Sequence, residues 1–222
     1  MIDWMLSAQN DVARLPALVW QQWWLSAGWS VVVAWLGAWS VRRWTTRQVP
    51  KLAVAVGLTI WVWLPGSWGG AYWLGLAFQA PSVAAVICAL FSLRMLLWPK
   101  PPEHFDNVWS RQLLFLVLCG VALGWILMLD TLGVWHGSFY NLGFGAAASA
   151  TALGIAVLPW IFATTALPSN SVTTVATATL LFVALRLPTG NLFDALIDPW
   201  LWGALQWALI QQWRRRPKPA ST

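Results

Sequence analysis

Charged residues are scarce in this sequence. Of its 222 residues, 9% are Asp, Glu, Lys or Arg and 59% are hydrophobic, whereas about a quarter of the residues in an ordinary soluble domain are charged. Several apolar runs approach the length that a helix needs to cross the ~30 Å hydrocarbon core of a bilayer. The composition therefore excludes an ordinary soluble domain and predicts an all-α, polytopic transmembrane helix bundle.

The sequence also has few residues of the types that form metal, haem or redox sites. Its two cysteines, Cys88 and Cys119, lie inside apolar runs without a CxxC or CxxH context, and we expect them to be core residues. Its two histidines, His104 and His136, fall on opposite predicted membrane faces, which argues against a haem held by both. No GxSxG, glycine-rich phosphate loop or HExxH motif is present. We therefore expect no cofactor and no metal.

Basic residues outnumber acidic ones and give a formal charge of +6. They lie at the ends of apolar runs, which is the placement of residues that determine membrane topology. Nucleic acid is therefore not an expected partner. The expected partners are the lipid bilayer and a membrane protein, either a different subunit or a second copy of this chain.

The apolar runs and their interruptions predict about seven spans. The expected spans are 17–41, 52–63, 82–98, 112–130, 140–166, 172–187 and 200–213. They form one bundle, 17–213, between an extracytoplasmic lead-in, 1–16, and a basic tail, 214–222. The segments 66–81 and 188–200 could be re-entrant, and a half-inserted hairpin before the short last span is the main alternative to seven crossings.

The basic residues also predict the orientation. One predicted face has only Arg14 and Arg186, and the positive-inside rule makes the other face cytoplasmic. That face holds Arg42, Arg43, Arg47, Lys51, Lys100, Arg111, Arg214, Arg215, Arg216 and Lys218. The predicted location is the cell inner membrane, with the N-terminus outside and the C-terminus in the cytoplasm.

Tryptophan is unusually frequent, with 21 residues. Most of them lie near predicted span ends, where indole rings anchor a protein in the headgroup layer. Trp29, Trp35 and Trp125 lie deeper, so each must face lipid or find a hydrogen-bond acceptor for its indole N–H.

Asp130 ends a long apolar run that begins after Arg111. A carboxylate at such a depth costs a few kcal/mol on insertion scales, so it is expected to face protein, water or a cation rather than lipid. One interpretation is a proton or cation site, or a catalytic acid or base assisted by His136. The other is structural, either an ion pair with Arg186 or a cap at the helix end.

Asp130, His136, Arg186, Asp194 and Asp198 all fall near the predicted outer face and form the candidate site. If residues 193–198 are helical, Asp194 and Asp198 are four residues apart and share one helix face, where they could bind a cation or bracket a substrate. The alternative is that Asp194 merely begins a short helix and Asp198 caps the last span.

The predicted fifth span begins with small residues, which allow helix backbones to approach closely. These residues are Gly143, Gly145, Ala146, Ser149, Ala150 and Gly154. Together with the lack of a catalytic motif, they favour a non-enzymatic subunit or assembly partner of a membrane complex. The alternatives are a small ion-coupled transporter that uses Asp130, for which no inverted repeat is evident, and a membrane enzyme with an outer-face Asp/His site.

Overall fold

The computed structural model describes residues 15–99, 111–134, 139–161 and 170–214. All regular structure in these residues is helical, which confirms the all-α class. The helices are α2 (Leu18–Val41), α3 (Gln48–Val62), α4 (Gly70–Phe78), α5 (Val83–Leu97), α6 (Arg111–Thr131), α7 (Ala146–Ile161), α8 (Asn170–Leu185), α9 (Leu192–Leu196) and α10 (Pro199–Arg214), with short 3-10 turns η2 (Gly66–Trp68) and η3 (Tyr140–Phe144). The expected lead-in and basic tail lie almost entirely outside the described residues.

Two of these helices are long and apolar enough to cross a membrane, namely α2 and the segment Leu113–Thr131 of α6. Helices α3 and α5 have 15 residues each, which corresponds to about 22 Å at 1.5 Å per residue. They are therefore shorter by themselves than the ~30 Å hydrocarbon core. The expected count of seven crossings thus goes beyond what helix length supports.

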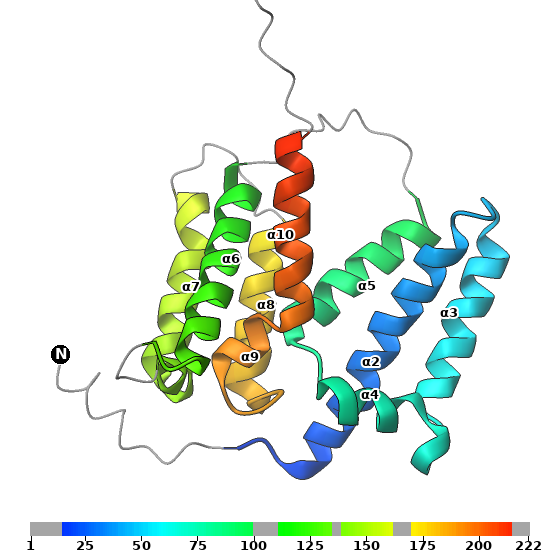
Figure 1. Ribbon diagram of the computed structural model, residues 1–222, viewed down its shortest axis with the longest axis horizontal. Coiled ribbons are helices and arrows are strands. Elements are labelled where there is room, and N and C mark those ends of the chain that lie inside the picture. Colours follow the sequence, from blue (N-terminus) through cyan, green and yellow to red (C-terminus); the bar gives the residue numbers. More distant parts are fainter. Residues whose placement is uncertain (1–14, 100–110, 135–138, 162–169, 215–222) are drawn as a thin grey trace, which may run out of the picture.

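The longer helices alternate in direction (Figure 1). Helices α2, α5, α7 and α10 run toward one end of the molecule, and α3, α6 and α8 run back. The short helices α4 and α9 lie at the opposite end. We call the end with α9 and η3 the acidic end and the end with the α2–α3 connection, residues 42–47, the basic end. Chain direction thus places the candidate site residues that the structure describes, Asp130, Arg186, Asp194 and Asp198, toward the acidic end.

The main apolar core lies where α5 meets α8 and α9. Its buried members are Val83, Ala84, Ala178, Phe182, Leu187, Leu192 and Ala195. A second and smaller cluster of alanines forms where α2 crosses α3. The core therefore joins the group of α2, α3 and α5 to the group of α6, α7 and α8.

Helix α6 turns most of its apolar surface outward. The apolar window of this helix has a mean hydropathy of 2.4, but only 6% of it is buried. Phe115, Leu118 and Trp125 are 40%, 50% and 45% exposed. Burying a large apolar side chain contributes roughly 1.5–3 kcal/mol of free energy, which is lost if the side chain stays in water. This surface is therefore suited to contact with lipid or another protein.

Helix α10 packs on α6 at two glycines of α6. A Cβ added at Gly120 would lie 2.9 Å from Leu205, and one added at Gly124 would overlap the ring of Trp202. The indole N–H of Trp202 donates to the carbonyl of Val121 at 3.2 Å. Small residues four apart permit this close helix contact, which was expected only at the fifth span.

Two helical segments are interrupted in the same way. After α3, a Leu-Pro turn with Gly66 at φ 61° leads into α4, a break at 79–82 and then α5. After α8, a Leu-Pro turn with Gly190 at φ 89° leads into α9, a break at 197–198 and then α10. Both α5 and α10 run toward the basic end (Figure 1). The two segments are therefore parallel in direction, rather than inverted.

The first break is held by tryptophans of α2. Trp24 and Trp29 donate their indole N–H groups to the carbonyls of Pro81 and Gln79, at 3.0 and 2.7 Å. Trp29 lies halfway along α2 and is 5% exposed, so this deep tryptophan has found the acceptor that it needs. The expected boundary between the segment 66–81 and the third span, 82–98, falls at this break, since α5 begins at Val83.

Some local expectations are wrong. The predicted fifth span begins at 140, but Tyr140–Phe144 form η3 and α7 begins at Ala146. The cause is that the amide of Tyr140 is bonded to a side chain of α6 and η3 folds against α9. Cys88 is exposed rather than in the core.

Candidate functional site

The carboxylate of Asp130 connects the end of α6 with the start of η3. Gly133, at φ 69°, adopts the left-handed conformation that ends α6. The amides of Phe139 and Tyr140 then donate to the two oxygens of Asp130, at 2.9 and 2.8 Å. Hydrogen bonds to an ionised acceptor are about twice as strong as neutral ones. Asp130 therefore fixes where the chain leaves α6 and returns toward α7.

Tyr140 continues this network to α9. Its hydroxyl donates to Oδ2 of Asp194 at 2.6 Å, and the hydroxyl of Thr189 donates to the same oxygen. The fully buried amide of Asn191 donates to the carbonyl of Tyr140 at 2.8 Å. Its Oδ1 accepts from the amide of Phe193 at 2.8 Å and so caps the start of α9. Two segments that are far apart in the sequence are thus joined through one tyrosine.

The surroundings of Tyr140 keep its phenol neutral. Burial raises the pKa of Tyr140 well above the ordinary tyrosine value, and the adjacent carboxylate of Asp194 raises it further. The phenol is therefore a hydrogen-bond donor at neutral pH, and not a base.

The same junction is tightly packed. The rings of Phe139 and Phe193 stack with centroids 5.4 Å apart and an interplanar angle of 14°. A Cβ added at Gly143 would overlap the Oδ1 of Asn191. η3 and α9 therefore approach each other at a distance that only glycine permits at position 143.

Asp198 occupies a different part of the molecule. Its Oδ1 accepts from the amide of Leu201 at 2.7 Å and caps α10, and its Oδ2 accepts from the amide of Ser82 at 2.8 Å. The side chain of Ser82 in turn accepts from the amide of Ala85 at 3.1 Å and caps α5. The positive ends of two helix dipoles thus meet at this carboxylate and stabilise its negative charge.

The contacts of α10 also indicate how deep Asp198 lies. Trp202, one turn after Asp198, donates to the carbonyl of Val121, which is in the middle of α6. One turn of helix is about 5.4 Å. Because α10 runs antiparallel to α6 and packs with Leu205 at Gly120 and Trp202 at Gly124, Asp198 lies about one turn beyond Gly124, toward the end of α6 where Asp130 lies.

The structure brings together only some of the predicted site residues. Asp130 and Asp194 are bridged by Tyr140, while Asp198 is elsewhere. The guanidinium of Arg186 lies over the ring of Phe182, at 5.1 Å from its centroid. His136 lies outside the described residues.

The helical arrangement that would place Asp194 and Asp198 on one face is not formed. Helix α9 ends at Leu196, and Ile197 is extended with φ −147°. The alternative expectation, that Asp198 caps the last long helix, is confirmed by its bond to Leu201. Ser82 and Thr189 also belong to these networks but were not predicted from the sequence, although a serine directly before an apolar run is a typical helix cap.

These contacts describe carboxylates that are used by the fold. Asp130, Asp194 and Asp198 each accept hydrogen bonds from amides or hydroxyls of the same chain. Within the described ranges, no group of three or more His, Cys, Asp or Glu side chains is arranged to hold a metal ion.

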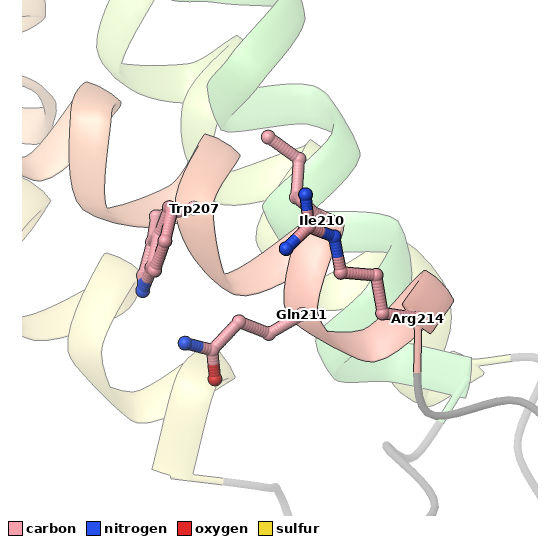
Figure 2. A pocket seen from close by; sticks show the side chains of 4 residues that line it. All are labelled: Trp207, Ile210, Gln211 and Arg214. Atoms are coloured by element: carbon pink, nitrogen blue, oxygen red, sulfur yellow. The ribbon is translucent and has the colours of Figure 1, made fainter.

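Two shallow hollows lie at the basic end, away from these acids. One, of about 250 Å³, is on α10 and is lined by Trp207, Ile210, Gln211 and Arg214 (Figure 2). The other, of about 310 Å³, is lined by residues 42–47 of the α2–α3 connection.

The chain matches no protein-family model, no curated protein sequence and no solved structure. Its function is therefore inferred from the geometry described above.

Proposed function

We propose that this chain is a multi-pass protein of the cell inner membrane, with about seven spans, its N-terminus outside and its C-terminus in the cytoplasm. The outward apolar surface of α6 supports a lipid environment, because only 6% of its apolar window is buried. The alternating directions of α2, α3, α5, α6, α7, α8 and α10 support the number of spans. Arg214 and the arginines among residues 42–47 lie at the same end of the molecule. This clustering supports the proposed orientation.

Within that membrane, we propose a non-enzymatic subunit or assembly partner of a membrane complex. The observation that carries this proposal is the use of Asp130, Asp194 and Asp198 as hydrogen-bond acceptors within the fold. Asp130 and Asp194 connect α6, η3 and α9 through Tyr140, and Asp198 connects α5 with α10. Carboxylates used in this way stabilise a scaffold. A scaffold of this kind offers its outer helix faces to a partner.

Helix α7 offers one such face. Ala150 and Gly154 are exposed on it, four residues apart, and a Cβ added at Gly154 would meet no atom within 4 Å. In a bilayer, small residues at this spacing let a second helix pack closely. The partner would be another membrane protein or a second copy of this chain.

The test is purification of the tagged protein from its own host in a mild detergent, followed by mass determination of every component. We expect a stoichiometric partner that is retained by the wild type and lost from Gly154→Leu. The matched control is Gly57→Leu on α3, because Gly57 is also exposed and a Cβ there also meets no atom within 4 Å. A wild-type protein that purifies alone and as a monomer would contradict the proposal.

An ion-coupled carrier is the second candidate, and the interrupted helices favour it. A break in a membrane helix is tolerated where the non-helical backbone is buried in protein or lines a water-filled cavity. Transporters often consist of two structural repeats, and in some of them the repeats are parallel. The two breaks meet in the bond from Ser82 to Asp198. This observation makes Asp198, rather than Asp130, the acid of interest.

Asp198→Asn separates the two candidates. A carrier coupled through this carboxylate should lose cation-dependent uptake, whereas a scaffold has no such uptake in the wild type. Stability should fall in either case, because an amide carries no charge to interact with the two helix N-termini. The enzyme alternative, with Asp130 and His136 as acid and base, gains no support from the described residues.

A further inference from the structure

The α2–α3 connection concentrates positive charge at the basic end. Arg42, Arg43 and Arg47 are all exposed, within six consecutive residues. These six residues line the hollow of about 310 Å³. The described carboxylates, by contrast, lie in the networks of α6, α9 and α10 toward the other end. An anion of suitable size would therefore meet three guanidinium groups in this hollow.

Two of these arginines are held in place by one ring. The guanidinium carbons of Arg42 and Arg43 lie 5.0 and 5.2 Å from the centroid of the Trp39 ring. Stacking on an aromatic ring leaves the N–H groups at the edge of the guanidinium plane free to donate. Paired guanidinium groups match the geometry of a phosphate, because each presents several donors in a fixed fork.

The rest of the connection is ordered by its own contacts. The hydroxyl of Thr45 accepts from the amide of Arg47 at 3.1 Å. Lys51 is 7% exposed, and its ammonium group donates to the carbonyl of Thr46 at 3.4 Å. Its positive charge thus lies beneath the same turn, and adds to the attraction for an anion.

Trp44 indicates where this anion would come from. Its side chain is 85% exposed, directly beside the arginines. An exposed indole next to basic residues is typical of the headgroup layer of a membrane, where the ring is partly covered by lipid. Phosphate groups of lipids lie in that same layer.

We propose that residues 42–47 form a binding site for the phosphate group of an anionic phospholipid in the cytoplasmic leaflet. This inference rests on the proposed membrane orientation. Arginines supply the charge, Trp39 positions two of them, and Trp44 lies against the lipid. Free inorganic phosphate has the same chemistry and is the alternative source, so the experiment has to separate the two.

The test uses the full-length protein, purified in a mild detergent and titrated with dioleoylphosphatidylglycerol, dioleoylphosphatidylcholine or inorganic phosphate. Bound lipid is counted by native mass spectrometry. We expect the wild type to bind phosphatidylglycerol in preference to phosphatidylcholine. R42Q/R43Q should bind phosphatidylglycerol roughly tenfold to thirtyfold more weakly than the wild type, since each basic residue near the surface attracts anionic lipid independently. The matched control R94Q/R214Q removes two exposed arginines from the same end, and we expect it to retain the preference.

Three results would overturn the inference. The first is equal binding of the two lipids, and the second is equal loss in both double variants, which would indicate only a general effect of net charge. The third is binding of inorganic phosphate without any preference for phosphatidylglycerol. Extraction of cell membranes with alkaline carbonate tests the proposed membrane location separately: protein that stays in the membrane while the lipid preference is absent would refute this site alone.

Discussion

Tyr140 forms hydrogen bonds through its amide, its carbonyl and its hydroxyl, with Asp130, Asn191 and Asp194 respectively. A single residue therefore connects the end of α6 with the start of α9. Because both partners of each bond come from one chain, the network contributes to the stability of the fold at the acidic end. It also fixes Asp130 and Asp194, two of the three acids of the candidate site.

Replacing Tyr140 with phenylalanine removes the hydroxyl and leaves Asp194 with one donor fewer. We expect a loss of about 1–3 kcal/mol in the free energy of unfolding, because a partly buried carboxylate loses a hydrogen bond. Thermal unfolding in detergent, followed by tryptophan fluorescence, measures the change. Tyr72→Phe is the control, since Tyr72 is 47% exposed. Equal stabilities of the two variants would show that the Tyr140–Asp194 bond contributes nothing.

The raised pKa of Tyr140 also predicts how stability depends on pH. The unfolded chain releases this phenolic proton at about pH 10, as ordinary tyrosine does, whereas the folded chain holds it to higher pH. Above about pH 10 the unfolded state therefore binds fewer protons than the folded state, so stability falls as pH rises. Tyrosinate absorbance of Tyr72→Phe, which leaves Tyr140 as the remaining tyrosine, should appear later in native than in denatured protein. Coincident titrations would contradict this.

At the scale of elements, the contact between α6 and α10 depends on a missing side chain. Gly124→Ala places a methyl group where the ring of Trp202 lies. We expect a loss of roughly 1–3 kcal/mol through displacement of that ring, together with weakening of its bond to Val121. The same thermal measurement applies. The control is Gly203→Ala on α10, where an added Cβ meets no atom within 4 Å; if it destabilises as much as Gly124→Ala, the packing explanation is wrong.

The elements themselves were largely predictable from the sequence, but their contacts were not. The expected third span, 82–98, corresponds to α5 (Val83–Leu97), because an apolar run bounded by Pro81 and Pro99 has little choice of limits. The cap at Asp198 was also predictable, since an acid before a proline is typical of a helix start. These signals are local in the sequence.

The network of Tyr140 could not be predicted in the same way. Its members come from α6, η3 and α9, separated by up to 64 residues between Asp130 and Asp194, and no local pattern records which segments fold back on each other. The same holds for the contact of α10 with α6, where the bonded residues Trp202 and Val121 are 81 residues apart. Glycine at 124 and 143 is the trace of these contacts in the sequence, but it can be interpreted only once the neighbour is known.

At the scale of the whole molecule, the two interrupted segments meet at a single polar contact. The break before α5 and the break before α10 are joined by the bond from Ser82 to Asp198, and the main core surrounds the start of α5. The contact therefore holds the first group of helices against the second. It gives the scaffold and the carrier proposals a common centre, which is why Asp198 is the residue that separates them.

The proposed orientation predicts which ends of the molecule a reagent can reach. In a protein with Cys88 and Cys119 replaced by serine, Ser67→Cys lies in η2 and Thr46→Cys lies in the α2–α3 connection, and both positions are exposed. We expect a membrane-impermeant maleimide to label Ser67→Cys on intact spheroplasts and Thr46→Cys only after lysis, because residues 42–47 carry the arginines that stay in the cytoplasm. The opposite pattern would reverse the orientation. Labelling of both positions on intact spheroplasts would show that α3, the helix between them, does not cross the membrane, and the smaller number of spans would then hold.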